Sequence, residues 1–194
     1  MAHSTHPRAL PVRSLPLPGV WVLVCLLYLL TPSRGALAQG DPHVADVNID
    51  LEVALLFRIG GIEDVTFGSY SGQGNLSRTD DVCVWTNASS GSYRVTAEGD
   101  GDGANKLFTV AKSNNAATVI AYTVSWTTAG GTTALSPKVA SANQSGANTV
   151  SSTCASGPAN PASYTVTFDE ADLLRVPHGS YSGTLTLIIS GPTS

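Results

Sequence analysis

With 194 residues, a formal net charge of −4 and only 12% charged residues, the chain is a weakly acidic protein. An acidic balance without a Lys/Arg cluster argues against nucleic acid or anionic lipid as a binding partner. Gly, Ser, Thr, Ala and Val are abundant, which is typical of β-rich, turn-rich domains and not of disordered chains.

The first residues of the chain have the pattern of a secretory signal peptide. An apolar run over residues 20–30 is preceded by arginines and followed by Ala36-Leu37-Ala38, a small-x-small cleavage site. A retained membrane anchor is the less favoured alternative, because a spanning helix needs roughly 20 apolar residues. We therefore expect residues 1–38 to be a signal peptide and residues 39–194 to be one exported domain, which keeps all 14 acidic residues.

Apolar and polar residues alternate with period two along most of the exported domain, which predicts strands and not helices. The longest alternating run covers residues 47–59 and greatly exceeds the roughly five or six residues of an ordinary strand. It is either one long first strand or two consecutive parts with separate tasks, and Gly60-Gly61 ends it. The same alternation predicts further strands at 65–67, 82–85, 93–97, 107–111, 119–127, 134–140, 164–168 and 181–189.

The turn signals between these runs decide the fold class. Residues 141–161 are polar and predict a loop, and residues 170–175 predict a single helical turn. About seven to nine short strands separated by turns predict an all-β, immunoglobulin-like β-sandwich. We expect its core to contain Phe57, Trp85, Trp126 and Phe168.

Two cysteines remain after the predicted cleavage, Cys83 and Cys154. An oxidising compartment favours a disulfide bond between them, although two separate buried thiols are the alternative. In the chain-entropy model, closing a loop of that length stabilises the fold by roughly 4 kcal/mol.

Three stretches of the predicted strands resemble a known family. The stretches are Val82-Cys83-Val84-Trp85, Tyr93-Arg94-Val95-Thr96-Ala97 and the closing Gly179-Ser180-Tyr181-Ser182-Gly183-Thr184-Leu185-Thr186-Leu187. Together they resemble spore coat protein U domains, which are similar to subunits of archaic chaperone–usher pili. The resemblance implies a sandwich that lacks its last strand. In such subunits a periplasmic chaperone lends a strand, and a neighbouring subunit later replaces it by β-strand addition.

The resemblance also suggests roles for two sets of residues. Val47, Ile49, Leu51 and Val53 would form the donor strand, and Tyr181, Leu185, Leu187 and Ile189 would line the acceptor groove along the last strand. The alternative is that residues 45–59 form only a long first strand and donate nothing. The family usually has a first-strand cysteine that bonds to one near Cys83, and this chain has none there. That departure points to a divergent branch, to a tip subunit without a donor, or to a domain that completes its own fold.

Other chemistry is weakly supported by the sequence. The stretch 98–105 is rich in Gly and Asp, but Ala104 occupies a ligand position of the usual calcium loop, so a turn is favoured over a calcium site. The exported domain contains only His43 and His178 and no Gly-x-Ser-x-Gly sequence, so no nucleophile, zinc set or phosphate loop is evident. We expect no catalytic site, no metal and no cofactor.

These observations together predict an exported structural subunit of a pilus or surface coat. Its partners would be a periplasmic chaperone, an usher and other pilus subunits, without nucleic acid and without insertion into a membrane; it would pass through the periplasm to the cell surface. The alternative is a self-contained secreted β-sandwich that binds carbohydrate or another surface ligand, for which an exposed Trp85 or Trp126 would be the sign. A secreted enzyme that uses His178 is a third, weaker hypothesis.

Overall fold

The computed structural model describes residues 47–193. In it, the segments with alternating apolar and polar residues form antiparallel strands in two layers. The chain divides into two units, Met1–Ile49 and Asp50–Ser194, and the fold is that of the second unit. The predicted signal peptide, residues 1–38, lies outside the described residues.

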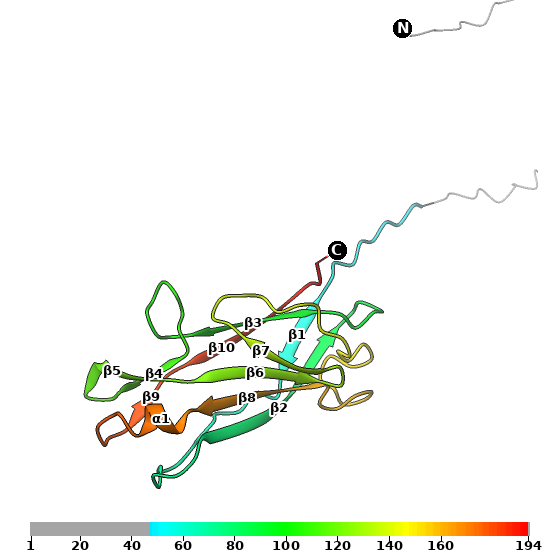
Figure 1. Cartoon of the computed structure of the whole chain (residues 1–194). Coiled ribbons are helices and arrows are strands. Elements are labelled where there is room, and N and C mark those ends of the chain that lie inside the picture. The colour runs from blue at the N-terminus through cyan, green and yellow to red at the C-terminus, as the bar shows by residue number, and fades with distance from the viewer. Residues whose placement is uncertain (1–46, 194) are drawn as a thin grey trace, which may run out of the picture. The chain divides into compact units, whose positions relative to one another are not determined.

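The first layer is a five-stranded sheet with the strand order β1-β2-β8-β6-β7 (Figure 1). Its register places Trp126 of β6 opposite Tyr164 of β8, and Val82 of β2 opposite Ala162 of β8. The inward side chains of β8 are all buried and the outward ones are half-buried, as period two requires. The strands are β1 (Phe57–Gly60), β2 (Leu76–Thr86), β6 (Thr123–Thr128), β7 (Gly131–Leu135) and β8 (Ala162–Phe168).

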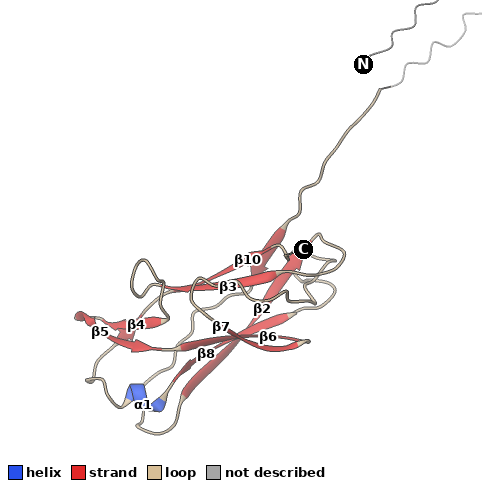
Figure 2. Cartoon of the chain, turned by 45° about the horizontal axis from the view of Figure 1, so that its top comes forward, coloured by secondary structure: helices blue, strands red, loops and turns tan. Residues whose placement is uncertain are grey.

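The second layer contains a pair of strands and a three-stranded sheet. β3 (Arg94–Gly99) pairs with β10 (Leu185–Ser190), and Figure 1 shows this pair lying over β6 and β8. β4 (Thr109–Lys112) lies between β5 (Asn115–Ala121) and β9 (Tyr181–Ser182). Figure 2 shows that strands dominate the described residues and that a short helix, α1 (Glu170–Leu173), follows β8.

The core lies between the two layers. Trp126 and Tyr93 are fully buried, and the indole Nε1 of Trp126 donates a hydrogen bond of 3.0 Å to the Tyr93 hydroxyl. Phe168 is buried as well, whereas Phe57 and Trp85 are half-buried. The all-β, immunoglobulin-like sandwich predicted from the sequence is therefore confirmed.

The long connection over residues 141–161 is a loop, as predicted, but it is held firmly. Cys83 of β2 and Cys154 of the loop form the predicted disulfide bond. Asn148 is fully buried, and its backbone N–H donates to the carbonyl of Val84 while its carbonyl accepts from the N–H of Thr86. The disulfide and these two bonds fasten the loop along β2.

Several strand predictions were wrong in extent. Residues 65–67 form no strand, although Val65 and Phe67 still pack against the core. The run 119–127 is two strands separated at Tyr122, because β5 pairs in one sheet and β6 in the other. The run 134–140 forms a strand only up to Leu135.

The closing run 181–189 is also divided, between Ser182 and Leu185. The Asp100 side chain accepts the Thr184 N–H at 2.9 Å, in place of a strand partner. A Cβ at Gly183 would lie 2.9 Å from the carbonyl oxygen of Thr109, so this close approach of two backbones needs glycine.

Candidate assembly edge

β10 has one paired edge and one open edge. It pairs with β3 along its whole length, from Leu185 opposite Gly99 to Ser190 opposite Arg94. Among residues 47–193, no backbone hydrogen bond joins the other edge of β10. An open edge presents a row of N–H and C=O groups that can pair with a further strand.

The side chains at this edge are apolar and incompletely covered. Leu185, Leu187 and Ile189 alternate along β10, pack against the core and remain half-buried, whereas the corresponding side chains of central β8 are buried. Ile188, on the outward face, is exposed. The edge therefore offers both free backbone groups and an apolar row with a two-residue repeat.

A second edge strand lies close to β10. Within residues 47–193, β1 pairs only with β2 and ends the five-stranded sheet, and it approaches β10 without bonding to it. Its Phe57 and Ile59 are half-buried and pack against the core, as do the three β10 side chains. We use the name open edge for Leu185, Leu187 and Ile189 of β10 together with Phe57 and Ile59 of β1.

Tyr181, the fourth predicted acceptor residue, lies away from the open edge. It is in β9, opposite Lys112 of β4, and its hydroxyl donates a hydrogen bond of 2.7 Å to the Pro177 carbonyl. The sequence pattern places Tyr181 on the same alternating run as Leu185, but the break at Gly183 separates them. Phe57 and Ile59 are site residues that the sequence pattern does not reveal. The alternation over residues 47–59 predicts them as strand residues but not as part of an acceptor edge.

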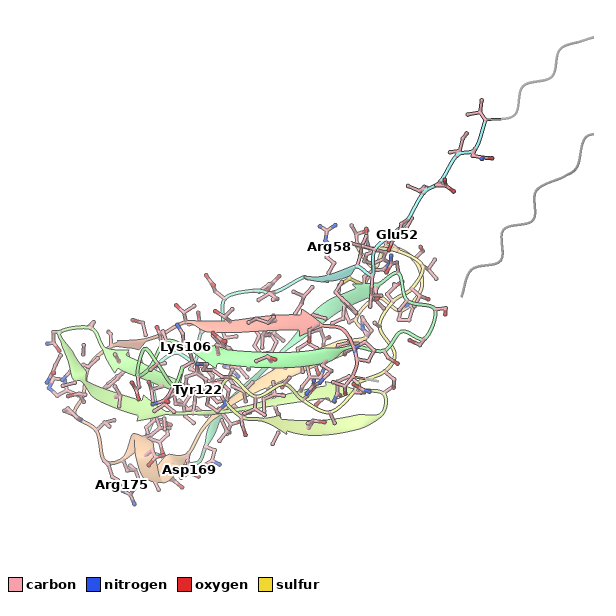
Figure 3. All side chains as sticks on the ribbon, turned by 90° about the horizontal axis from the view of Figure 1, so that it is seen from above. Glu52, Arg58, Lys106, Tyr122, Asp169 and Arg175 are labelled. Carbon is pink, nitrogen blue, oxygen red and sulfur yellow. A yellow bond between two sulfur atoms is a disulfide. The ribbon has the colours of Figure 1, made fainter. Side chains whose placement is uncertain are left out.

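The residues proposed as a donor are exposed apolar side chains. Val47, Ile49, Leu51 and Val53 are 80%, 88%, 85% and 68% exposed, and no strand includes them. We call residues 47–53 the N-terminal arm. The alternative of one continuous first strand over 45–59 does not hold, because β1 begins only at Phe57. Figure 3 shows Glu52 on the ribbon that leads into β1.

The segment that follows β1 is hydrogen-bonded to two strands of the first sheet. The Tyr164 hydroxyl donates to the carbonyl of Glu63 at 3.3 Å, and the Glu63 N–H donates to the Asp80 carboxylate at 3.0 Å. Burial, followed by the negative charge of Asp80, raises the pKa of Tyr164 to about 12. These contacts fasten the segment after β1 to the first sheet, so the strandless stretch that contains Val65 is anchored.

The weaker candidates from the sequence lack a built site. In the stretch 98–105, the candidate calcium loop, Asn105 donates a hydrogen bond to the side chain of Asp102 within a turn. The Asp100 carboxylate accepts the N–H of Thr184. Across residues 47–193 no group of three or more His, Cys, Asp and Glu side chains could hold a metal ion. His178 is exposed, and His43 lies outside the described residues. The absence of catalysis, metal and cofactor stays a prediction.

The sign expected for a carbohydrate-binding sandwich is not met at Trp126, which is completely buried, and Trp85 is half-buried. A shallow cavity of about 410 Å³ lies elsewhere, between the turn after β3 and the β4–β5 hairpin, and is lined by Asp100, Leu107 and Val119 among others. Within the described part of the chain, no helix is both long and apolar enough to cross a bilayer.

A solved structure shares the fold. A chain in the structure of a chaperone–tip adhesin complex, described as vital for synergistic activation of CFA/I fimbriae biogenesis, matches with a TM-score of 0.52 and 18% identity, over 71% of this chain and 42% of that chain. CfaE, the adhesive subunit of CFA/I fimbria of enterotoxigenic Escherichia coli, matches with a TM-score of 0.47 and 16% identity, over 65% of this chain and 39% of that chain. The chain thus spans less than half the length of these structures. No protein-family model and no curated protein matches the sequence.

Proposed function

We propose that this protein is an exported structural subunit of a pilus or surface coat, and that it assembles by β-strand addition. The single observation that supports this most is the presence, in one chain, of an open apolar strand edge and an exposed alternating apolar arm. The fold shared with a chain of a chaperone–tip adhesin complex of fimbriae supports the same proposal. Spore coat protein U domains are the specific family that its sequence motifs favour.

The arm and the edge have matching repeats. A strand rises about 3.3 Å per residue, so the seven residues of the arm would extend about 23 Å, close to the roughly 20 Å of the six-residue β10. The arm places an apolar side chain at every second position, and β10 has half-covered apolar side chains at every second position. Main-chain bonds would give affinity and the alternate side chains would give specificity.

This assembly explains why the arm is tolerated on an exported protein. Four large apolar side chains in a row, exposed together, form a patch that monomeric proteins rarely display. Pairing with the open edge of a neighbouring subunit would cover both surfaces at once. Before assembly, a periplasmic chaperone would have to cover the open edge and an usher would direct the exchange, as the resemblance implies.

The test is association of the secreted chain, starting at residue 39, measured by sedimentation and by size-exclusion chromatography. Leu51→Asp should weaken association by about 10- to 100-fold, because it removes roughly 1.5–3 kcal/mol of apolar burial and adds a charge. Asn48→Asp is the matched control: it adds the same charge on the opposite, polar face of the arm and should change association little.

A second experiment uses a chain that begins at Ala54 and a synthetic peptide of residues 44–55. The shortened chain should be a monomer that binds the peptide. Its melting temperature should rise when the peptide is added, because a ligand that binds only the native state stabilises that state. The same peptide with Leu51→Asp should not raise the melting temperature. Assembly by strand addition would be refuted if the shortened chain bound neither peptide and the chain that starts at residue 39 stayed monomeric.

A further inference from the structure

Asn87 connects the end of β2 to the segment just before β1. Its side-chain Oδ1 accepts the Leu56 N–H at 2.8 Å, and its Nδ2 donates to the Ala54 carbonyl at 2.8 Å. Its own backbone N–H donates to the Leu56 carbonyl at 3.3 Å. The last regular pair of this ladder is Phe57 opposite Thr86. The Asn87 amide therefore extends the β1–β2 ladder as a peptide group would, beyond the point where β2 ends.

The held stretch ends abruptly at Ala54. Upstream of it, within residues 47–53, no backbone group has a partner among the described residues. Exposure falls gradually across this point, from 68% at Val53 to 54% at Leu55 and 49% at Leu56, so the hydrogen bonds alone mark the boundary. Leu55 also lies beside the end of β10, because a Cβ at Gly191 would come within 3.7 Å of the Leu55 Cδ2 atom.

We propose that Asn87 is the positioning residue that fixes the root of the N-terminal arm and so determines which apolar side chains a second copy of this chain receives. The inference rests on the proposed function. With residues 54–56 held on their own subunit, Val47, Ile49, Leu51 and Val53 are free to be donated and Leu55 is not. The register between neighbouring subunits then follows from where the clamp ends.

Loss of the clamp changes the register by a discrete step. Side chains alternate between faces, so a slip of one residue would turn the apolar row away from the acceptor, whereas a slip of two keeps it facing inward. Releasing Ala54 to Leu56 would make Leu55 the next apolar side chain available to the neighbour. Asn87 thus excludes one alternative register that the sequence of the arm would otherwise permit.

An aspartate scan of the arm tests the boundary. Single substitutions to Asp at positions 47, 49, 51, 53 and 55 are compared by the association assay on the chain that starts at residue 39. Association should fall by about tenfold or more at the first four positions and by less than about twofold for Leu55→Asp. If Leu55→Asp weakens association as much as Leu51→Asp, the boundary at Ala54 is wrong and the proposal falls. If none of the five has an effect, strand addition itself is refuted and the inference falls with it.

The same scan in the background Asn87→Ala tests the residue. There Leu55→Asp should weaken association by about tenfold, because Leu55 has become part of the donated row. Asn143→Ala is the matched control, since this exposed asparagine forms a similar pair of bonds to the backbone of Thr193 and should leave the scan unchanged. An unchanged scan in the Asn87→Ala background would overturn the proposal.

Hydrogen exchange separates the clamp from assembly. In the unassociated chain, Asn87→Ala should speed exchange of the Leu56 amide by roughly tenfold, while amides in β3 and β8 keep their rates. Asn87→Asp keeps the acceptor for the Leu56 N–H but loses the donor to Ala54, so its effect at Leu56 should be smaller. If Leu56 exchanges at the same rate in all three proteins, Asn87 does not hold the root and the proposal is overturned.

Discussion

Replacing Asn148 by alanine should destabilise the fold more than any other single polar substitution in the loop over residues 141–161. The Asn148 side chain is fully buried and forms four hydrogen bonds. Its Nδ2 donates to the carbonyls of Ser156 at 2.7 Å and Pro158 at 2.8 Å, and its Oδ1 accepts the N–H groups of Val150 at 2.8 Å and Ser151 at 2.9 Å.

The magnitude follows from those four bonds. At roughly 0.5–1.5 kcal/mol of net stabilisation each, their loss would cost about 2–6 kcal/mol. We expect about 3 kcal/mol for Asn148→Ala, because the freed backbone groups of this surface loop can partly turn to water. Asn143→Ala is the control: it removes two bonds from an exposed side chain and should cost less than about 1 kcal/mol.

The assay is equilibrium unfolding in urea, followed by tryptophan fluorescence, with the free energy of unfolding obtained by linear extrapolation. Trp126 is a suitable probe, since it is fully buried against Tyr93. A cost below about 1 kcal/mol, or a cost equal to that of Asn143→Ala, would refute the view that Asn148 organises the loop. Repeating the pair without the disulfide would show whether Asn148 and Cys154 act together on the same segment.

Three further predictions concern the core, the disulfide and the tyrosines. Tyr93→Phe should cost about 1–3 kcal/mol in the urea assay, because it leaves the buried Trp126 N–H without its acceptor; Tyr181→Phe, at a less buried hydroxyl, should cost less, and equal costs would contradict this. The double substitution Cys83→Ser, Cys154→Ser should lower the free energy of unfolding by about 4 kcal/mol, and an unchanged midpoint would contradict the chain-entropy argument. Burial raises the pKa of both Tyr122 and Tyr164 to about 12 from the ordinary 10.0, so folding favours the neutral phenols. Their contribution to the free energy of unfolding should be fully present below pH 10 and should be lost as the pH rises from 10 to 12. Phenolate absorbance of the folded chain with an ordinary midpoint near 10 would show this reasoning to be wrong.

The alternation in the sequence predicts which side chains face inward, but not which strand pairs with which. The run over 119–127 is a clear example: Ile120, Tyr122, Val124 and Trp126 all face the core, as predicted, yet the chain changes sheets at Tyr122. A strand that crosses from one layer to the other can keep one face inward throughout, so its apolar pattern shows no break. Only the partners reveal the division.

The candidate site was predictable in its apolar residues and not in its polar ones. Val47 to Val53 were recognisable from their alternation, and Leu185, Leu187 and Ile189 from the closing strand. Asn87 gave no such signal, because an asparagine after a strand most often indicates a turn. Its bonds to Ala54 and Leu56 span more than 30 positions and depend on the pairing of β1 with β2. Asn148 was hidden in the same way, within a stretch whose composition predicts only a polar loop.

The root of the arm also bears on whether this chain could fill its own open edge. Leu55 lies beside Gly191, so the arm leaves the fold near the C-terminal end of β10. Lying along its own β10 from there would require the chain to reverse direction between Val53 and Phe57. That stretch, Ala54-Leu55-Leu56, contains no Gly, Pro, Asn or Asp, the residues that tight turns favour. Asn87 further holds it in line with β1. Self-completion is therefore opposed both by the turn chemistry and by the clamp, whereas donation to a second molecule needs neither to change.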